Sequence, residues 1–341
     1  MLCHAVLVLL AASLSGTEAL AAVPLGGAAA LRNAAVVFLK PHAANDACES
    51  FVRSLLEKSG VEVGPTIIKV ASQINEQKLI DQHYGALATL AMDTQPAALS
   101  LSAAAEESFK TTFGKQWSAT LPSMLRNDEA LKVLGVDGMT LESMWRGGVQ
   151  VKLAPGTYVS KLDLSATAHD GALDECFTIN GFYPAMRQKF VEDGASVRCM
   201  VCEWDEAQLS WKAFRRELIG ATNPADALPG SARSELLARW KELGLAEEPS
   251  MGLNGVHASA GPLEGLKERC IWAGASLEKD ELAQQLVSAG GLSGEVLDEW
   301  LRDNPAVCLG GQTDKVFDLT EELSAAAVVE LVQQQQQQPC A

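Results

Sequence analysis

Six side chains in this sequence are of types that bind phosphate groups and accept one of them. Lysine and arginine neutralise phosphate charge, while hydroxyl and amide groups add directed hydrogen bonds. A neutral histidine offers a ring-nitrogen lone pair near pH 7 and can act as a nucleophile. Taken singly, each of these residues is more often a solvated charge or a core side chain. Together they have the composition of a polyphosphate site: Lys40, Arg216, Thr222, Arg233, Asn254 and His257.

Alternating strand and helix patterns place these side chains at the ends of elements. Lys40 directly follows a β-rich run, and Arg216 lies on an amphipathic helix. The others lie in, or at the end of, the Pro- and Gly-rich loop that leads to His257. Asp46 and Ser72 are predicted as helix caps. The predicted strands cover 34–39, 61–70, 196–203 and 270–272, and the predicted helices cover 46–58, 72–84, 205–219 and 261–269.

The segments that carry these residues resemble the motifs of nucleoside diphosphate kinases, in that family's order. Ile219–Arg233 (IGATNPADALPGSAR) resembles the family's signature loop, and Asn254–Ser259 (NGVHAS) resembles its N-x-x-H-G-S motif. Shorter matches are Phe38-Leu-Lys-Pro41, Gln82-His-Tyr84, Phe182-Tyr-Pro184 and Lys267-Glu268 followed by Trp272. The resemblance covers two stretches, roughly residues 34–90 and 176–272.

This resemblance implies a mixed α/β (α+β) fold, a ferredoxin-like sandwich with an antiparallel sheet covered by helices. It also implies transfer of the terminal phosphate of a nucleoside triphosphate, such as ATP, to a nucleoside diphosphate through a phosphohistidine. The family uses Mg²⁺ bound mainly through the nucleotide, so no metal cluster built from protein side chains is expected. Homo-oligomers are typical of the family.

The implied roles follow the matched motifs. His257 would accept the phosphate, with Glu268 bonded to its other ring nitrogen and Ser259 supporting the ring. Catalysis would rest on His257, Glu268 and Lys40. The remaining assignments place Tyr84 and Arg233 around the transferred group, Arg216 and Thr222 at the inner phosphates, Asn254 at the sugar and Phe182 against the base.

The chain also departs from the family pattern. K-P-D-G becomes Lys40-Pro41-His42-Ala43, and H-G-S-D becomes His257-Ala-Ser-Ala260. Extra residues lie around 240–250, and a long segment, 91–175, separates the two matched stretches. These changes leave a second interpretation open: a catalytically weak nucleotide-binding or assembly module whose insertion binds a protein partner. The retained chemical residues favour the enzyme, whereas the altered flanks and the insertions favour the module.

Three regions lie outside the matched stretches. The insertion, 91–175, is predicted to open with an Ala- and Ser-rich linker over 91–110. It would continue with helices over 121–134 and 140–146 and a hairpin, 149–162, in a winged-helix-like pattern. A helical, acidic extension is predicted for 276–332, with Leu282, Leu286, Leu297, Trp300 and Leu301 as packing residues. A Gln-rich tail, 333–341, is predicted to be disordered.

Net charge and the N-terminal sequence indicate which partners and which cell compartment to expect. The formal net charge of −16 argues against a non-specific nucleic-acid binder, which needs a positive surface. Residues 1–21 have the short apolar run and small-x-small end of a secretory signal, and 22–33 are compatible with a transit segment. The protein is therefore expected to be secreted or organelle-targeted, and otherwise cytoplasmic. No later segment is apolar and long enough to predict a membrane span.

One cysteine pair has the C-x-x-C spacing, Cys199 and Cys202. It lies on a predicted strand, where positions three apart point to opposite faces. A shared metal or a redox disulfide is therefore not expected. No second C-x-x-C completes a zinc site, so the cysteines are interpreted as structural.

Overall fold

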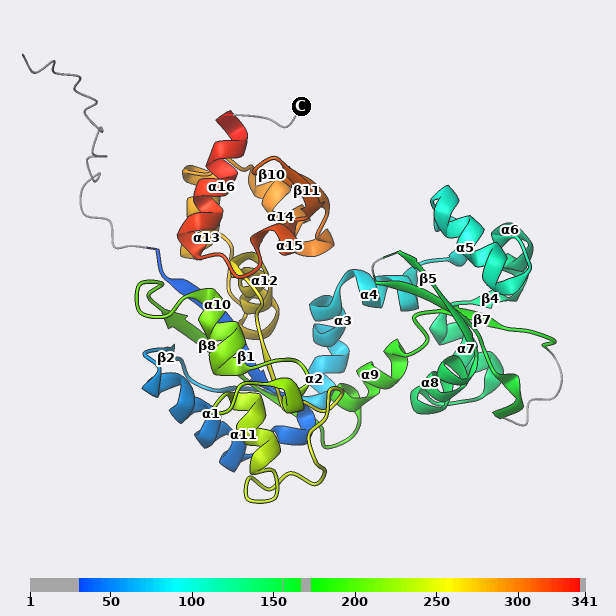
Figure 1. The fold of residues 1–341 in the computed structure, drawn as a ribbon, viewed down its shortest axis with the longest axis horizontal. Coiled ribbons are helices and arrows are strands. Elements are labelled where there is room, and N and C mark those ends of the chain that lie inside the picture. Colours follow the sequence, from blue (N-terminus) through cyan, green and yellow to red (C-terminus); the bar gives the residue numbers. More distant parts are fainter. Residues whose placement is uncertain (1–30, 155, 167–172, 338–341) are drawn as a thin grey trace, which may run out of the picture. The chain divides into compact units, whose positions relative to one another are not determined.

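The computed structural model describes residues 31–154, 156–166 and 173–337 (Figure 1). The predicted signal peptide, residues 1–21, lies outside these ranges. Among the described residues, no helix combines the length and apolar character needed to cross a bilayer.

An antiparallel sheet forms the centre of the fold. Its strands run in the order β2-β8-β1-β9, and β3 also pairs with β8. Their bounds are Asn33–Leu39 (β1), Glu62–Val63 (β2), Ile67–Val70 (β3), Ser196–Trp204 (β8) and Val256–Ala258 (β9). The single strand expected over 61–70 is thus two strands, because Pro65 lacks the N–H that would continue the ladder.

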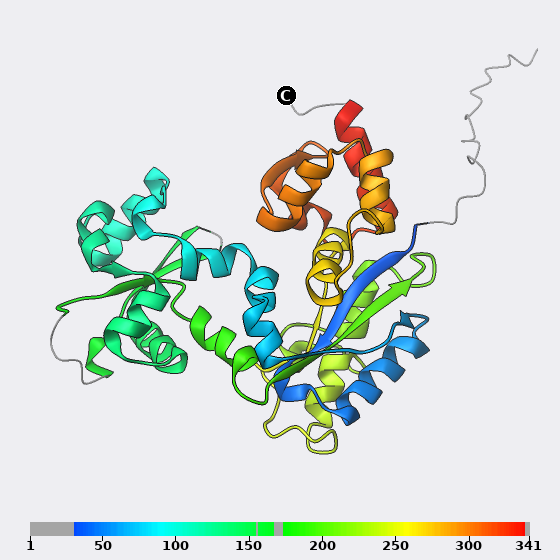
Figure 2. The same ribbon diagram turned by 180° about the vertical axis from the view of Figure 1, so that it is seen from behind.

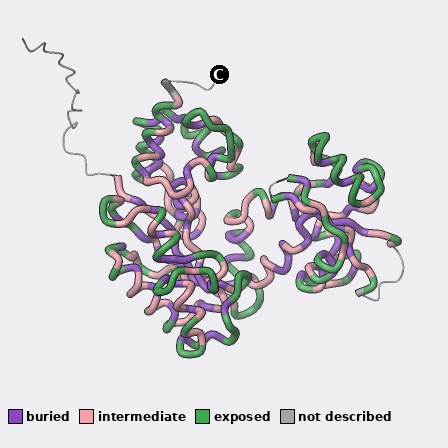
Figure 3. The backbone as a smooth tube through the Cα atoms, viewed as in Figure 1, coloured by how far each residue is buried: buried purple, intermediate pink, exposed green. Residues whose placement is uncertain are grey.

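Strand β1 is buried on both faces, which explains why it reads as one apolar run (Figure 3). Val37 and Leu39 face one core, while Val36 and Phe38 face another. The C-x-x-C pair on β8 behaves in the same way. Cys199 belongs to the core of Phe38 and Cys202 to the core of Val37, and both are free thiols.

Helices cover each face of this sheet. The core of Val37 lies under α1 (Asp46–Lys58), α10 (Trp211–Ala213), the π-helical turn η6 (Phe214–Ile219) and α11 (Ala232–Ala238). In Figure 2 the blue α1 lies beside the yellow-green α11. The core of Phe38 lies under α2 (Ala71–Glu76), α3 (Leu79–Tyr84), α9 (Tyr183–Val191) and the end of α12 (Pro262–Ala273).

Several predicted boundaries in these helices were wrong. The cap of α1 is Asn45, whose side chain accepts a hydrogen bond from the Cys48 N–H at 2.8 Å. Ser72 lies inside α2, which begins one residue earlier. Residues 270–272 are not a strand, because α12 continues through them to a left-handed cap at Gly274. A short apolar run fits a buried helix and a buried strand equally well, and here packing decided.

The insertion has its own four-stranded sheet, in the order β4-β7-β6-β5. The expected hairpin is present as β5 and β6, whereas part of the expected linker is helix α5, capped by Ser102. Strand β7 lies beyond residue 175 yet pairs with β6. Helix α4 (Ala86–Ala88) precedes the insertion. The elements of this sheet and its helices are α5 (Ala103–Phe113), α6 (Trp117–Thr120), β4 (Met124–Leu125), α7 (Asn127–Leu134), α8 (Gly138–Gly147), β5 (Val149–Ala154), β6 (Thr157–Lys161) and β7 (Phe177–Ile179).

The C-terminal extension packs on Leu263 and Leu266 of α12 through the leucines and tryptophan expected from the sequence. It is not wholly helical, since β10 and β11 form a hairpin. Helix α16 includes residues 333–337, which were wrongly expected to be disordered. Glutamine is a good helix former, and buried Val328 and Val332 anchor the helix. The elements are α13 (Glu281–Ser288), α14 (Gly294–Asp303), β10 (Ala306–Leu309), β11 (Gln312–Lys315), α15 (Val316–Thr320) and α16 (Ala325–Gln337).

Helix α12 lies against β1 at Gly265. A methyl group added at this position would lie 2.6 Å from the Ala34 carbonyl oxygen. Replacing Gly265 with Ala is therefore expected to lower the free energy of unfolding by about 1–3 kcal/mol, because helix or strand must shift. Thermal unfolding would measure this. Gly294→Ala is the matched control, since nothing lies within 4 Å of its added methyl. Equal stability of the two variants would contradict the close approach.

Candidate functional site

A cavity of about 630 Å³ lies where β1 and β9 end, and it gathers side chains from distant parts of the chain. Lys40 follows β1, Arg216 comes from η6, and His257 lies on β9. All six residues of the predicted polyphosphate site line this one cavity: Lys40, Arg216, Thr222, Arg233, Asn254 and His257.

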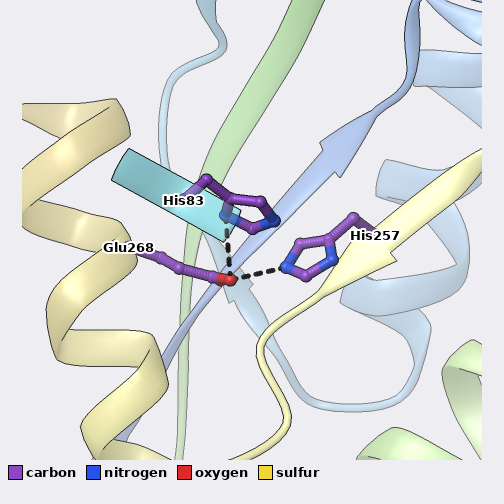
Figure 4. Close-up of side chains that lie close together, drawn as sticks. All are labelled: His83, His257 and Glu268. Carbon is purple, nitrogen blue, oxygen red and sulfur yellow. Dashed lines mark hydrogen bonds and ion pairs between the residues drawn. The ribbon is translucent and has the colours of Figure 1, made fainter. Parts of the chain in front are cut away.

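The ring of His257 is fixed by contacts on two sides. Its Nε2 lies 2.7 Å from Oε1 of Glu268 on α12 (Figure 4). Phe38 is its direct partner across the β1–β9 ladder, and the two rings stack with centroids 4.6 Å apart. Because the acceptor at Nε2 is a carboxylate, the ring proton belongs on Nε2. The lone pair then lies on Nδ1, which has no hydrogen-bond partner among the described residues.

Glu268 connects this histidine to the sheet. Its side chain is buried, and its second oxygen accepts a hydrogen bond from the Ser259 hydroxyl at 2.6 Å. The Ser259 oxygen in turn accepts the backbone N–H of Val36 at 2.9 Å. Burial raises the pKa of Glu268, whereas Ser259 and the nearby charges of Lys267 and Arg269 act in the opposite direction. The carboxylate is therefore held between α12, β1 and β9, and its position fixes the histidine.

A second histidine, His83 of α3, also lies beside Glu268. Its Nδ1 is 3.3 Å from the Glu268 carboxylate, and its ring meets that of His257 edge-on at 4.6 Å (Figure 4). The Trp272 indole Nε1 lies 3.3 Å from the same Nδ1, so a carboxylate and an indole N–H both face this ring nitrogen. Burial lowers the pKa of His83 to about 3, so its ring is neutral. No role was expected for this residue, although it precedes Tyr84 in the matched Gln82-His-Tyr84 segment.

The His83, His257 and Glu268 ligand atoms lie within 4.8 Å of one another, close enough to bind a divalent metal ion. Two features disfavour that use. The Trp272 N–H already occupies the Nδ1 of His83. Positive charges also surround the group, because Lys40 acts on both imidazoles, Lys267 on His83 and Arg233 on His257. The arrangement serves better to orient an imidazole than to coordinate a cation.

Four cationic and three acidic side chains line the cavity, and the buried cations repel one another. Burial, together with the positive charges of Arg233 and Lys189, lowers the pKa of Lys40 to about 8. Burial and the charge of Arg215 likewise lower the pKa of Arg233 to about 10. The pKa of His257 falls to about 3, because burial outweighs the attraction of Glu264 and because Lys40 and Arg233 repel a proton. His257 is therefore neutral and nucleophilic at physiological pH, in surroundings that attract anions.

Backbone carbonyl groups position the cations and amides of the cavity. Arg233 donates to the Gly220 carbonyl at 2.7 Å and to the Val256 carbonyl at 3.0 Å. Asn254 donates to the Thr222 carbonyl at 3.0 Å, which links the two motif loops. The Oδ1 atom of Asn254 is buried and has no hydrogen-bond partner within the described part of the chain. A buried, unsatisfied acceptor at the wall of a cavity fits a ligand that donates a hydrogen bond.

Tyr84 and Phe182 line a second, smaller cavity of about 240 Å³ instead. The two cavities share Lys40. Phe182 also packs edge-on against Trp145 of α8 in the insertion, with ring centroids 5.2 Å apart. The two predicted nucleotide contacts thus lie on the other side of Lys40 from Arg216, and the insertion covers part of one of them.

The sequence matches no protein-family model, and a search of curated proteins finds no relative. Among solved structures, the chain is similar to a nucleoside diphosphate kinase from Encephalitozoon cuniculi, at 15% identity. That match covers 71% of this chain and 90% of the other, with a TM-score of 0.34. An NDP kinase from Pyrobaculum aerophilum matches at 18% identity over 71% and 96% of the two chains, again with a TM-score of 0.34. These scores are too low to assign a function, which must be inferred from the site.

Several polar residues of the site were not anticipated from the sequence. Glu264 lines the main cavity and accepts the Ala260 N–H, and burial beside Glu268 raises its pKa to about 7. His42 accepts the Gly255 N–H at 3.0 Å and so ties the loop after β1 to the histidine motif. Glu322 of the C-terminal extension also lines the cavity. The signal that the sequence offered is Ala260 itself, which stands where the H-G-S-D motif has an acid.

Proposed function

We propose that this protein is a nucleoside diphosphate kinase that transfers the terminal phosphate of ATP, or another nucleoside triphosphate, to a nucleoside diphosphate. One observation carries the proposal. His257 has one ring nitrogen bonded to a buried carboxylate, and it lines a cavity whose other walls supply Lys40, Arg216 and Arg233. A held imidazole among cations is the arrangement that a phosphate-accepting histidine requires.

The reaction would proceed as two half-reactions, one that phosphorylates His257 and one that discharges it. The Nδ1 lone pair of His257 attacks the γ-phosphorus, and the bond from that phosphorus to the bridging oxygen breaks, releasing the diphosphate. The β-phosphate oxygen of a second diphosphate then attacks the phosphohistidine, and the P–N bond breaks. Glu268 holds the Nε2 proton throughout. Lys40 and Arg233 would stabilise the charge on the transferred group.

The cavities have features that fit a whole nucleotide. Arg216 and Thr222 would bind the inner phosphates, and a sugar hydroxyl would satisfy the buried Oδ1 of Asn254. The base would enter the smaller cavity beside Phe182, with Tyr84 near the phosphate end. Mg²⁺ would arrive bound to the nucleotide and share in neutralising its phosphates.

The ferredoxin-like sandwich is part of the same proposal. The strand order of the central sheet and its antiparallel pairing support it. So does the chain order β1-α1-β2/β3 followed by β8-α11-β9, with helices between the strands. In this interpretation, the insertion between α3 and α9 and the extension after α12 are additions to a complete core.

A second candidate function is a weakly catalytic binding or assembly module. Three observations favour it. Arg216 is already bonded to Glu322, and Phe182 is packed on the insertion. The insertion also exposes Val133 and Val149, each more than half accessible, as a protein-binding surface would.

Incubation with γ-labelled ATP separates the two functions. The kinase should acquire label that is stable to alkali and labile to acid, and adding a nucleoside diphosphate should discharge it as triphosphate. A protein that binds ATP but never becomes labelled would be the binding module. A protein that binds no nucleotide would exclude both functions.

Replacing Glu268 with Gln is expected to slow this labelling by about tenfold to a hundredfold without abolishing it. The Gln carbonyl can still accept the Nε2 proton, while its amide group can donate to the Ser259 oxygen. The charge that favours the correct tautomer is lost. Single-turnover labelling rates would measure the effect. Glu264→Gln is the comparison for loss of a neighbouring carboxylate, and an equal or larger slowing there would contradict the assignment to Glu268.

A further inference from the structure

An acidic pair from the C-terminal extension reaches the arginines of the main cavity. Arg216 donates to Oε1 of Glu322 at 2.6 Å, and Arg215 donates to the same oxygen at 3.2 Å. Arg215 also forms an ion pair with Glu321. The Glu322 side chain is only 14% exposed and lines the cavity, so its carboxylate lies inside the site.

The backbone around this pair is held against the histidine motif. The Glu322 N–H donates to the carbonyl of Ala260, three residues after His257, at 3.1 Å. At Gly261, an added methyl would lie 2.9 Å from the Thr320 carbonyl oxygen. Glu322 itself has a φ of 59°, in the left-handed region that a glutamate rarely adopts. Such a conformation persists only where surrounding contacts impose it, and it is common at ligand sites.

A carboxylate bonded to two guanidinium groups uses the same donors that a phosphate would use. We propose that Glu322 is a built-in competitor for the phosphate chain, through which the C-terminal extension lowers the affinity of the site. A polyphosphate would displace the carboxylate by taking over Arg216 and Arg215. The inference rests on the proposed function in one respect only, namely that the cavity binds a polyphosphate.

The competition should act in both directions. If the Glu322 contacts weaken phosphate binding by a certain free energy, bound phosphate must weaken the docking of the extension by the same free energy. A ligand in the cavity should therefore loosen the segment between α15 and α16. Glu322 bonds neither Lys40, whose backbone N–H donates to the Gly255 carbonyl, nor Arg233, which donates to the Gly220 carbonyl, so both would still attract the ligand while Glu322 is in place.

The test compares binding of tripolyphosphate and of ATP to the whole protein and to two variants, by calorimetry. Glu322→Gln keeps the shape of the side chain and removes its charge. It is expected to bind tripolyphosphate about tenfold more tightly than the unmodified protein. Glu330→Gln, an exposed position on α16, removes the same charge outside the cavity and should leave binding unchanged. If Glu322→Gln unfolds, Glu322→Asn is the alternative, because asparagine tolerates the left-handed conformation.

The outcomes separate this proposal from the nucleotide kinase. Tighter tripolyphosphate binding by Glu322→Gln without any ATP binding would support the competitor and exclude the kinase. Equal or weaker binding by Glu322→Gln, in a protein that labels from ATP, would overturn the competitor alone. Absence of binding of either ligand to every variant would overturn both. Amide hydrogen exchange gives a second readout, since saturating tripolyphosphate should speed exchange around Glu322 and Leu323 in the unmodified protein.

Discussion

Replacing His257 with Ala should reduce phosphoenzyme formation by about 10⁴-fold or more. The variant lacks the only atom that bonds to phosphorus in the proposed reaction, and no other described group can supply it at the same place. His83 lies beside it, but it lines neither of the two cavities, and its Nδ1 faces Glu268 and the Trp272 indole. Nucleotide binding should be largely kept, because Lys40, Arg216 and Arg233 remain.

The measurement is labelling from γ-labelled ATP, together with an independent binding titration. His42→Gln is the matched control, since it removes an imidazole near the site while the glutamine side-chain oxygen can still accept the Gly255 N–H that His42 accepts. It should retain labelling. Undiminished labelling of the His257→Ala variant, or label found at another residue of the unmodified protein, would show that His257 is not the nucleophile.

Replacing Lys40 with Met should lower the rate of transfer by about 10²-fold. Lys40 directly follows β1, lies in the cavity with His257 and contacts both cavities. Its positive charge would stabilise the negative charge on the phosphoryl group while that group passes from the nucleotide to His257. Methionine keeps most of the side-chain volume and removes that charge. An unchanged single-turnover rate would exclude Lys40 from the reaction.

The low pKa of Lys40 also predicts a pH dependence. Burial and two neighbouring cations place this pKa at about 8, so the ammonium form dominates below that value. The pH profile of kcat/KM reports the ionisable groups of the free enzyme, so kcat/KM should fall as the pH rises through about 8. Lys40→Arg keeps its charge to higher pH, so the fall should move upward in that variant. A profile that is identical in both proteins would assign the titration to another group.

Residue type and local periodicity were sufficient to predict much of this protein. The apolar run of β1, the amphipathic helix α1 and the hairpin of β5 and β6 each carry their own pattern within a few residues. Six residues of the main cavity were also found from their types and their motifs, because phosphate chemistry limits which side chains can serve, whereas Glu264 and Glu322 were not. The side chains of Cys199 and Cys202 lie on opposite faces of the sheet, as the two-residue period of a strand predicted.

Tertiary structure decided what depends on partners far away in the chain. The run at 270–272 became helix because Trp272 packs under the sheet beside Phe38, and the glutamines of α16 became helix because valines before them are buried. Phe182 packs against Trp145 of the insertion, and Glu322 reaches Arg216 across more than a hundred residues. No local pattern encodes such contacts, because they arise only when packing brings separate elements together.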